Sequence, residues 1–269
     1  MSIKLIALDV DDTLLTSNQQ IAESTKSALK EALAKGIKVV LCSGRPLAGV
    51  DHYLDELGVQ GDDQYVITYN GALVETAAGK VLSRKIINNK DYRRIVKFVE
   101  DRKMQYYVLD DDSNVYTSNH DINRFAVTQA WENSAGIFVR EPDELASDFE
   151  IAKAAIVGEK ETLDQYEQAV KDEFADEYYV VRAGANFIEI MHPEVNKGEG
   201  LTTLADILHL SSDEIMAFGD EKNDLPMFDF VGSAVAMGNG SDIAKEHAKY
   251  VTDTNNNDGI AKSLKKYVL

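Results

Sequence analysis

The sequence lacks the features that mark secreted, membrane-spanning and disordered proteins. It contains one cysteine, Cys42, and only four prolines in 269 residues, which excludes a disulfide framework and argues against long disordered linkers. No apolar run approaches the ~20 residues needed to cross a bilayer. The N-terminal Met1-Ser2-Ile3-Lys4 shows no charged-then-apolar leader pattern. We therefore expect a cytoplasmic protein, in which Cys42 is a small buried apolar residue.

Positive charge is also scarce. Against 46 Asp and Glu stand 28 Lys and Arg, so the formal net charge is −18. This excess speaks against a nucleic-acid backbone or an anionic membrane as a partner. It would also repel a phosphate ester at long range, so a site for such a substrate would need cations of its own. The hydrophobic content of 44% is ordinary for a soluble globular protein, and the length allows two domains.

What the sequence does have is a group of carboxylates directly behind an apolar run. The run 5–8 leads into Asp9, and Asp11 and Asp12 follow within three positions. Such crowding costs electrostatic energy unless a cation or shared protons relieve it. Ligands of open α/β sheets bind at the carboxyl ends of the strands, although Asp-rich turns also occur for purely local reasons. This stretch suggests a metal-assisted site on Asp9 and Asp11. Whether it is such a site or only a local Asp-rich turn depends on the rest of the chain.

The spacing of hydrophobic residues predicts two different patterns of secondary structure along the chain. Alternating strands and helices suggest βαβ units and a parallel sheet: a helix over 21–35, a strand over 37–42, a helix from Pro46 to Leu57, a strand over 65–68 and a hairpin ending at 84. Residues 85–191 show a mixed α+β pattern, typical of an antiparallel sheet with helices on one face. The alternation of strands and helices resumes after residue 192. We predict an α/β fold with a Rossmann-like core from 1–84 and 192–269 and an inserted α+β domain over 85–191.

Two segments of the core could bind an anion. Ser43 and Gly44 precede the helix expected at Pro46, and the free N–H groups of a helix N-terminus bind anions, although Ser43 could equally be a plain cap. Lys197 begins another expected helix, where the helix dipole disfavours a cation by ~0.3–1 kcal/mol. A lysine in that place suggests an anion nearby, and a solvated surface lysine is the common alternative.

A third segment repeats the opening pattern. The strand expected over 214–218 delivers Asp220 at its carboxyl end, and Asn223 and Asp224 start the next helix. Asp224 also suits a first helical turn on electrostatic grounds alone. Asp9, Asp11 and Asp220 together form a hard, oxygen-only set suited to Mg²⁺. With an anion site and a lysine, these are the parts that phosphoryl transfer requires.

The four segments, in this order, resemble the four motifs of the haloacid dehalogenase-like hydrolases: residues 9–14, 43–45, 196–198 and 219–224. The insertion between the second and third motifs resembles the Cof-type branch with a large α/β cap. The turn 69–72 and the stretch 44–50 look most like the YidA-type sugar phosphatases. The resemblance covers essentially the whole chain.

This resemblance implies a role for each matching position. Asp9 would attack phosphorus to form an aspartyl-phosphate, and Asp11 would act as the general acid and base. Substrate binding would fall to four positions, namely Ser43, Gly44, Lys197 and Asn223. Mg²⁺ would be held by Asp9, the Asp11 carbonyl and Asp220, with Asp224 supporting them. The close family has Gly where this chain has Asp12; if the backbone is extended there, Asp12 faces away from Asp11 and we expect it to be tolerated.

The resulting hypothesis is a Mg²⁺-dependent phosphatase of small phosphorylated metabolites, with sugar phosphates as the expected substrates. A phosphotransferase or phosphomutase would use the same aspartyl-phosphate, and a non-catalytic phosphosugar sensor is a further alternative that the presence of both Asp9 and Asp11 disfavours. The cap, 85–191, is expected to select the leaving group. The expected partner is a small-molecule phosphate ester, and the sequence carries no signal of an oligomeric state.

Overall fold

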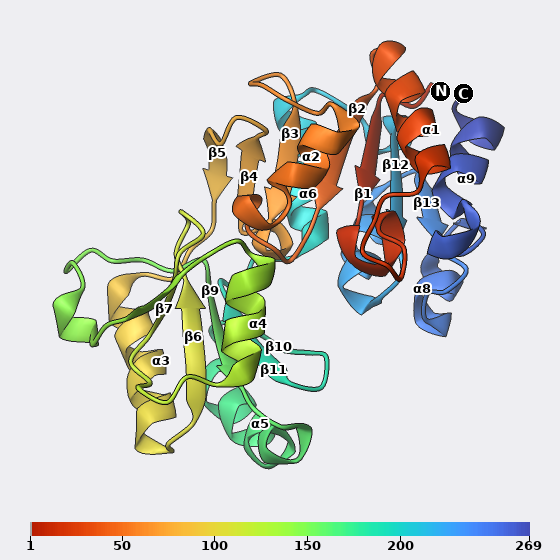
Figure 1. Cartoon of the computed structure of the whole chain (residues 1–269). Helices are drawn as coiled ribbons and strands as arrows, with labels where there is room; N and C mark the ends of the chain where they lie inside the picture. The colour runs from red at the N-terminus through yellow and green to blue at the C-terminus, as the bar shows by residue number, and fades with distance from the viewer. Residues whose placement is uncertain (1) are drawn as a thin grey trace. The chain divides into compact units, whose positions relative to one another are not determined.

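The computed structural model describes residues 2–269, which form two compact units. Unit 1 contains residues 2–45, Val50–Arg84 and Asn196–Leu269, and unit 2 contains Pro46–Gly49 and Lys85–Val195. The chain leaves unit 1 after Arg84 and returns to it at Asn196, so both ends of the sequence build the same unit. Figure 1 shows this directly, since the red N-terminal and blue C-terminal helices lie side by side.

Unit 1 is built on an eight-stranded sheet. Its spatial order is β14-β13-β12-β1-β2-β3-β4-β5; the strands from β14 to β3 run parallel, and β4 and β5 add an antiparallel hairpin. The central strands are apolar and buried along their whole length, as expected where helices cover both faces. Their bounds are β1 Leu5–Leu8, β2 Lys38–Cys42, β3 Tyr65–Thr68, β4 Leu73–Thr76, β5 Val81–Arg84, β12 Ile215–Gly219, β13 Ser233–Ala236 and β14 Tyr250–Val251.

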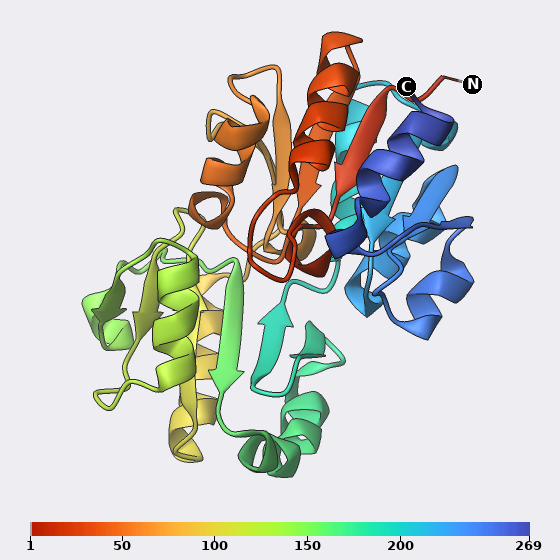
Figure 2. The ribbon, with the colours of Figure 1, turned by 45° about the vertical axis from the view of Figure 1, so that its right-hand side comes forward.

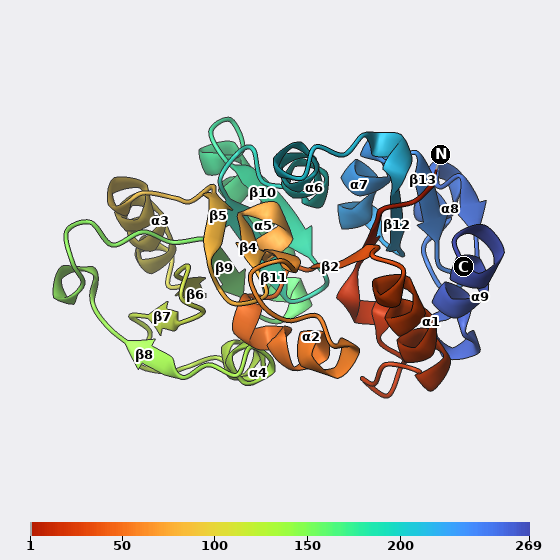
Figure 3. The ribbon, with the colours of Figure 1, turned by 90° about the horizontal axis from the view of Figure 1, so that it is seen from above.

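Helices cover both faces of this sheet (Figure 3). On one face lie α1 (Glu23–Ala34), α2 (Asp51–Leu57) and α9 (Gly259–Tyr267), and on the other α6 (Lys197–Ile207), α7 (Leu225–Phe230) and α8 (Asp242–His247). Alternate strand residues such as Leu5 and Val40 pack with Leu201 of α6 and Met227 of α7 in one buried cluster. The predicted α/β fold with a parallel-sheet core is confirmed.

The helix expected from Pro46 to Leu57 is not continuous, so that prediction was wrong. A short 3₁₀ helix covers Leu47–Gly49, and α2 begins only at Asp51. Between them Val50 takes φ −130° and ψ −10°, outside helical geometry. Glycine and β-branched valine are both poor helix formers, which explains the break at this point. Ser43 and Gly44 therefore do not lie at the N-terminus of a long helix.

Unit 2 contains a six-stranded sheet in the order β10-β11-β9-β6-β7-β8, antiparallel except for the parallel pair β7 and β8. Its strands are β6 Gln105–Leu109, β7 Val115–Thr117, β8 Ile137–Val139, β9 Lys153–Val157, β10 Tyr179–Ala183 and β11 Phe187–Met191. Two helices, α3 (Asn89–Asp101) and α5 (Lys160–Phe174), pack on one face, around residues such as Tyr106.

A third helix of unit 2 lies on the opposite face, which corrects the expectation of helices on one face only. The hydroxyl of Tyr107, whose side chain points away from that of Tyr106, donates to Gln129 of α4 (Arg124–Glu132) over 3.3 Å. The small buried residues Ala126 and Ala130 let α4 approach the sheet, and Figure 2 shows α4 in front of the sheet. No helix among residues 2–269 is long and apolar enough to cross a membrane.

Candidate active site

Two neighbouring parallel strands deliver the first pair of carboxylates. Strand β1 pairs with β12 in the register Leu8 to Phe218, so Asp9 and Asp220 leave the sheet at the same edge. One oxygen of each, together with one of Asp224, lies within 4.8 Å of the others. All three aspartates are buried. The structure thus brings together three of the four acidic residues expected at a metal site.

Lys197 lies between two of these carboxylates. It is the first residue of α6, and its ammonium Nζ is 2.5 Å from Oδ1 of Asp9 and 2.7 Å from Oδ1 of Asp224. Only 1% of the residue is exposed, which excludes the alternative of a solvated surface lysine. Burial alone would lower the pKa of Lys197, but the charges of Asp224 and Asp9 raise it above its usual range. The ammonium is a fixed positive charge inside the site.

Close backbone contacts on α6 set the position of that lysine. A Cβ on Gly198 would lie 2.3 Å from the carbonyl oxygen of Pro226, at the start of α7. On the other side, a Cβ on Gly71 would lie 2.2 Å from the carbonyl oxygen of Asn196. Only glycine fits such distances, so these two residues allow the first turn of α6 to seat between two other segments. Asn196 also caps the helix, accepting from the N–H of Glu199 over 2.8 Å.

Asp224 organises the site. Its Oδ1 accepts from Lys197, and its Oδ2 accepts from the backbone N–H groups of Asp220 and Glu221 over 2.9 and 3.1 Å. A Cβ on Gly219 would come within 2.5 Å of the Asp224 carboxyl carbon, so the last residue of β12 must be glycine. Asp224 thereby ties the lysine to the loop that carries Asp220.

Three buried carboxylates with one ammonium leave the site short of positive charge. Burial, and next the charge of Asp224, raise the pKa of Asp9 well above its usual range despite the opposing effect of Lys197. The same two causes raise the pKa of Asp220 from 3.8 to about 6. A divalent cation would relieve both, and clustered carboxylate oxygens are what Mg²⁺ prefers. The residues present therefore fit a magnesium ion.

Asp11 is directed elsewhere. Its carboxylate is paired with Arg45, whose Nη2 donates to Oδ1 over 2.6 Å and whose Nε donates to Oδ2 over 3.1 Å. The Asp11 side chain is 49% exposed, in contrast to Asp9. The structure thus separates a buried carboxylate from a solvent-facing one two residues away. From the sequence, Arg45 could either face the site or form an ion pair within a helix; its partner in the structure, Asp11, lies 34 positions earlier in the sequence.

The remaining predicted residues occupy the surrounding loops. Ser43 is buried at the end of β2, and its Oγ accepts from the N–H of Arg45 over 3.1 Å. Gly44 lies against Asn70, whose side-chain amide would be 3.2 Å from a Cβ at position 44. Asn223 is exposed in the short turn that precedes α7. Ser43 therefore acts locally on Arg45, and Asn223 has solvent in front of it.

In the turn Val10–Leu14 the backbone is extended at Asp11 but not at Asp12, which corrects the expectation for Asp12. That residue adopts the left-handed conformation, with φ 56° and ψ 4°, so the geometry that would point its side chain away from Asp11 does not apply. Glycine suits this conformation best, and Asp is among the residues that tolerate it. The next residue, Thr13, donates from its hydroxyl to Oδ1 of Asp220 over 2.9 Å. Neither feature has a signal in local sequence.

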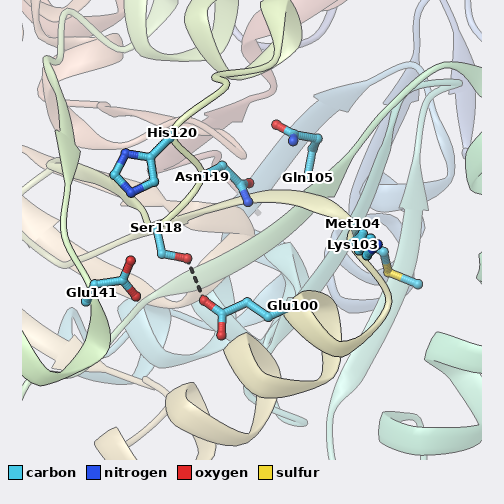
Figure 4. Close-up of a pocket in the computed structure, with 8 residues that line it drawn as sticks. All are labelled: Glu100, Lys103, Met104, Gln105, Ser118, Asn119, His120 and Glu141. Carbon is cyan, nitrogen blue, oxygen red and sulfur yellow. Dashed lines mark hydrogen bonds between the residues drawn. The ribbon is translucent and has the colours of Figure 1, made fainter.

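Unit 2 contains a separate polar cavity of about 280 Å³. Glu100, Ser118, His120 and Glu141 are among the residues that line it (Figure 4), and the hydroxyl of Ser118 donates to Glu100 over 2.6 Å. None of the predicted site residues belongs to it. His120 is exposed at this cavity.

Comparison with known proteins gives a consistent result. A sequence model described as haloacid dehalogenase-like hydrolase matches residues 6–264. "Putative phosphatase YxeH" of Bacillus subtilis (strain 168) is 36% identical over 267 residues, covering 99% of this chain and 98% of YxeH. The 5-amino-6-(5-phospho-D-ribitylamino)uracil phosphatase YcsE of the same organism is 29% identical, covering 100% and 97%. A haloacid dehalogenase-like hydrolase from Bacteroides thetaiotaomicron superposes with a TM-score of 0.90 at 27% identity, covering 98% and 99%.

Proposed function

The chain belongs to the haloacid dehalogenase-like hydrolases and is a phosphatase of that family, and from this premise we propose its chemistry: Mg²⁺-dependent hydrolysis of small phosphate monoesters, sugar phosphates above all, through an aspartyl-phosphate on Asp9. Unit 1 is the catalytic core in this proposal, and unit 2 is the cap that selects the leaving group.

One observation carries the proposal. Asp9, Lys197, Asp224 and Asp220 form a single buried cluster, with the lysine in contact with two of the carboxylates. Burying such a charged set costs several kcal/mol per ion before pairing, and the fold shows no structural need for it. Phosphoryl transfer needs a positioned nucleophile and concentrated positive charge around the phosphoryl oxygens, and this cluster supports both.

In the first half-reaction, an oxygen of Asp9 attacks phosphorus and the bond from phosphorus to the leaving oxygen breaks. Asp11 donates its proton to that oxygen, so an alcohol leaves. General acid catalysis of this kind contributes ~10²–10⁴-fold. Because Arg45 donates to both oxygens of Asp11, one of these two bonds has to open for the proton transfer, while the other keeps the carboxyl group oriented. Lys197 and Ser43 hold the phosphoryl oxygens.

In the second half-reaction, water attacks the phosphorus of the aspartyl-phosphate. Asp11, now a carboxylate, takes a proton from that water, the bond between phosphorus and Asp9 breaks, and inorganic phosphate leaves with Asp9 restored. The different surroundings of the two aspartates suit this division of labour. Asp9 is buried against Lys197, whereas Asp11 faces solvent, where alcohol and water come and go.

Magnesium, when bound, would neutralise the negative charge that the phosphate brings to the site. Asp9, Asp220 and the backbone carbonyl of Asp11 would hold it, and Asp224 would support them from behind through its bonds to the loop of Asp220. Gly44 and Asn223 would line the substrate-binding side.

The experiment is phosphate release from an aryl phosphate and from a panel of sugar phosphates, with Mg²⁺ and with EDTA, for the wild-type protein and for Asp9→Asn. Metal-dependent release that Asp9→Asn abolishes supports the proposal, and the ranking within the panel identifies the substrate class. A phosphotransferase or phosphomutase would instead yield a phosphorylated product without free phosphate. A folded, Mg²⁺-binding protein that turns over nothing would point to a phosphosugar sensor.

A further inference from the structure

The turn that carries Asp11 is held by a residue from the far end of the chain. The side-chain amide of Asn239 donates from Nδ2 to the carbonyl oxygen of Asp12 over 2.7 Å, across 227 positions. Its Oδ1 accepts from the backbone N–H of Asn255 over 2.9 Å. Asn255 in turn donates from its own Nδ2 to the carbonyl oxygen of Leu15 over 2.8 Å, and this bond is buried. Two asparagines therefore hold the turn, one at its middle residue and one directly after its last residue.

The bond from Asn239 falls on the residue with the least favourable backbone in the turn. Asp12 is left-handed, at φ 56°, a conformation that costs most residues other than glycine about 1 kcal/mol or more. The φ angle of Asp12 also sets the plane of the peptide that joins it to Asp11, and so the direction of the Asp11 carbonyl. A contact that holds Asp12 in place therefore fixes the aim of Asp11.

The loop that carries Asn239 holds the second strand end as well. Two residues on, the N–H of Ser241 donates to the carbonyl oxygen of Asp220 over 2.8 Å, and its hydroxyl adds a longer bond of 3.3 Å to the same oxygen. Gly240 lies so close that a Cβ there would be 2.8 Å from that oxygen. One loop thus sets the spacing between the backbones of Asp12 and Asp220.

We propose that Asn239 is a positioning residue for the metal site: by fixing the left-handed turn at Asp12 it holds the backbone carbonyl of Asp11 in place, and this carbonyl would bind Mg²⁺ together with Asp9 and Asp220. The expected effect of Asn239 on activity rests on the proposed function. Its expected effect on Mg²⁺ binding can be measured without turnover. The two side-chain bonds of Asn239 join it to backbone atoms of Asp12 and Asn255, so its effect is transmitted through the backbone of Asp12.

The sharpest variant is Asn239→Asp, which keeps the oxygen that accepts from Asn255 and replaces the donor facing Asp12 with an acceptor. Its added negative charge would by itself strengthen Mg²⁺ binding, so weakened binding reports position and not charge. Asn239→Ala removes both bonds. The matched control is Asn256→Ala, since Asn256 also makes two side-chain bonds, to the backbone and hydroxyl of Ser17, outside the turn.

Each protein is measured for its midpoint of thermal unfolding in EDTA, for the Mg²⁺ concentration that half-saturates it in a calorimetric titration, and for kcat and KM with an aryl phosphate. We expect Asn239→Asp and Asn239→Ala to raise the half-saturating Mg²⁺ concentration by about three- to ten-fold, the range of one net hydrogen bond. We also expect kcat at limiting Mg²⁺ to fall with it, while KM changes by less than about two-fold. Asn256→Ala should match the wild type in Mg²⁺ response.

A second substitution tests whether the effect of Asn239 passes through the backbone of Asp12. Glycine accepts the left-handed conformation at no steric cost, so Asp12→Gly combined with Asn239→Asp should recover part of the lost Mg²⁺ affinity. The proposal is overturned if the Asn239 variants lower the unfolding midpoint in EDTA but have the same half-saturating Mg²⁺ concentration as the wild type. It is also overturned if Asn256→Ala raises that concentration as much as the Asn239 variants do. A wild-type protein that binds Mg²⁺ but releases no phosphate would defeat the proposed function alone, because the Mg²⁺ comparison still decides the role of Asn239.

Discussion

The guanidinium of Arg45 donates to both carboxylate oxygens of Asp11, over 2.6 Å to Oδ1 and 3.1 Å to Oδ2. Lysine cannot reproduce this two-point contact, because it offers a single point charge on a flexible stem. For Arg45→Lys we expect kcat with an aryl phosphate to fall about ten-fold, and KM to change little, since the pair orients Asp11 and does not hold the phosphate. Steady-state kinetics check this, with Arg93→Lys in unit 2 as the control. Unchanged kcat would show that the pair is a surface contact only.

Replacing the buried lysine should damage stability as well as activity. Lys197→Met leaves Asp9 and Asp224 without their shared ammonium, and loss of one partner from a buried pair costs about 3–5 kcal/mol. Adding Asp224→Asn removes one of the stranded charges, so the double variant should lose less stability than the two single changes together. Urea unfolding in EDTA measures this coupling. Additive losses would mean that the two side chains do not interact energetically.

Asp9, the proposed nucleophile, should itself destabilise the metal-free protein. Burial and the charge of Asp224 raise the pKa of Asp9, so the folded state binds its proton more tightly than the unfolded state does. At a pH above the usual pKa of an aspartate, the buried Asp9 carboxyl therefore opposes folding. We expect Asp9→Asn to abolish phosphate release and to raise the unfolding midpoint at pH 7.5 in EDTA. A lower midpoint would show that the bond to Lys197 outweighs the cost of burial.

Protons and Mg²⁺ should compete for Asp220. Its pKa rises from 3.8 to about 6 on folding, through burial and then through Asp224. The folded, metal-free protein keeps a proton in this interval that the unfolded chain releases, so its free energy of unfolding should decrease as the pH rises from about 4 to about 6. The stabilisation by Mg²⁺ should instead increase with pH, from small at pH 5.5 to large at pH 7.5. Thermal unfolding with Mg²⁺ and with EDTA across this range measures both trends, and a stabilisation independent of pH would remove Asp220 from the metal site.

Asp12→Gly should leave the half-saturating Mg²⁺ concentration unchanged and stabilise the protein by up to about 1 kcal/mol, because glycine adopts the left-handed conformation more readily. Mg²⁺ titration and urea unfolding decide between this outcome and a direct role for the carboxylate. A large change in Mg²⁺ affinity would make the Asp12 side chain part of the site.

The sequence predicted site residues best where an apolar run marks a strand and a carboxylate follows it directly. The apolar runs before Asp9 and Asp220 placed both residues at strand ends, and two parallel neighbours necessarily end at the same edge. Lys197 was found at its helix start, but its burial between two carboxylates depends on glycine contacts with other segments. The pairing of Arg45 with Asp11 and the bond from Asn239 to Asp12 join positions far apart in sequence, so no local pattern contains them. The break at Val50 was missed because proline at position 46 favoured a helix start more visibly than glycine at position 49 disfavoured its continuation.

The central position of β1, between β12 and β2, also bears on how the protein is made. Thr13 and Asp220 are bonded across 207 positions, so the first strand to leave the ribosome waits for a partner that is synthesised much later. At about 5–20 residues per second, the N-terminal half-sheet stays exposed for ten seconds or more, while unit 2 can already fold. A chain that stops before β12 has Asp9 but neither Asp220 nor Asp224. The candidate active site is therefore assembled only after β12 and the turn that follows it have been synthesised.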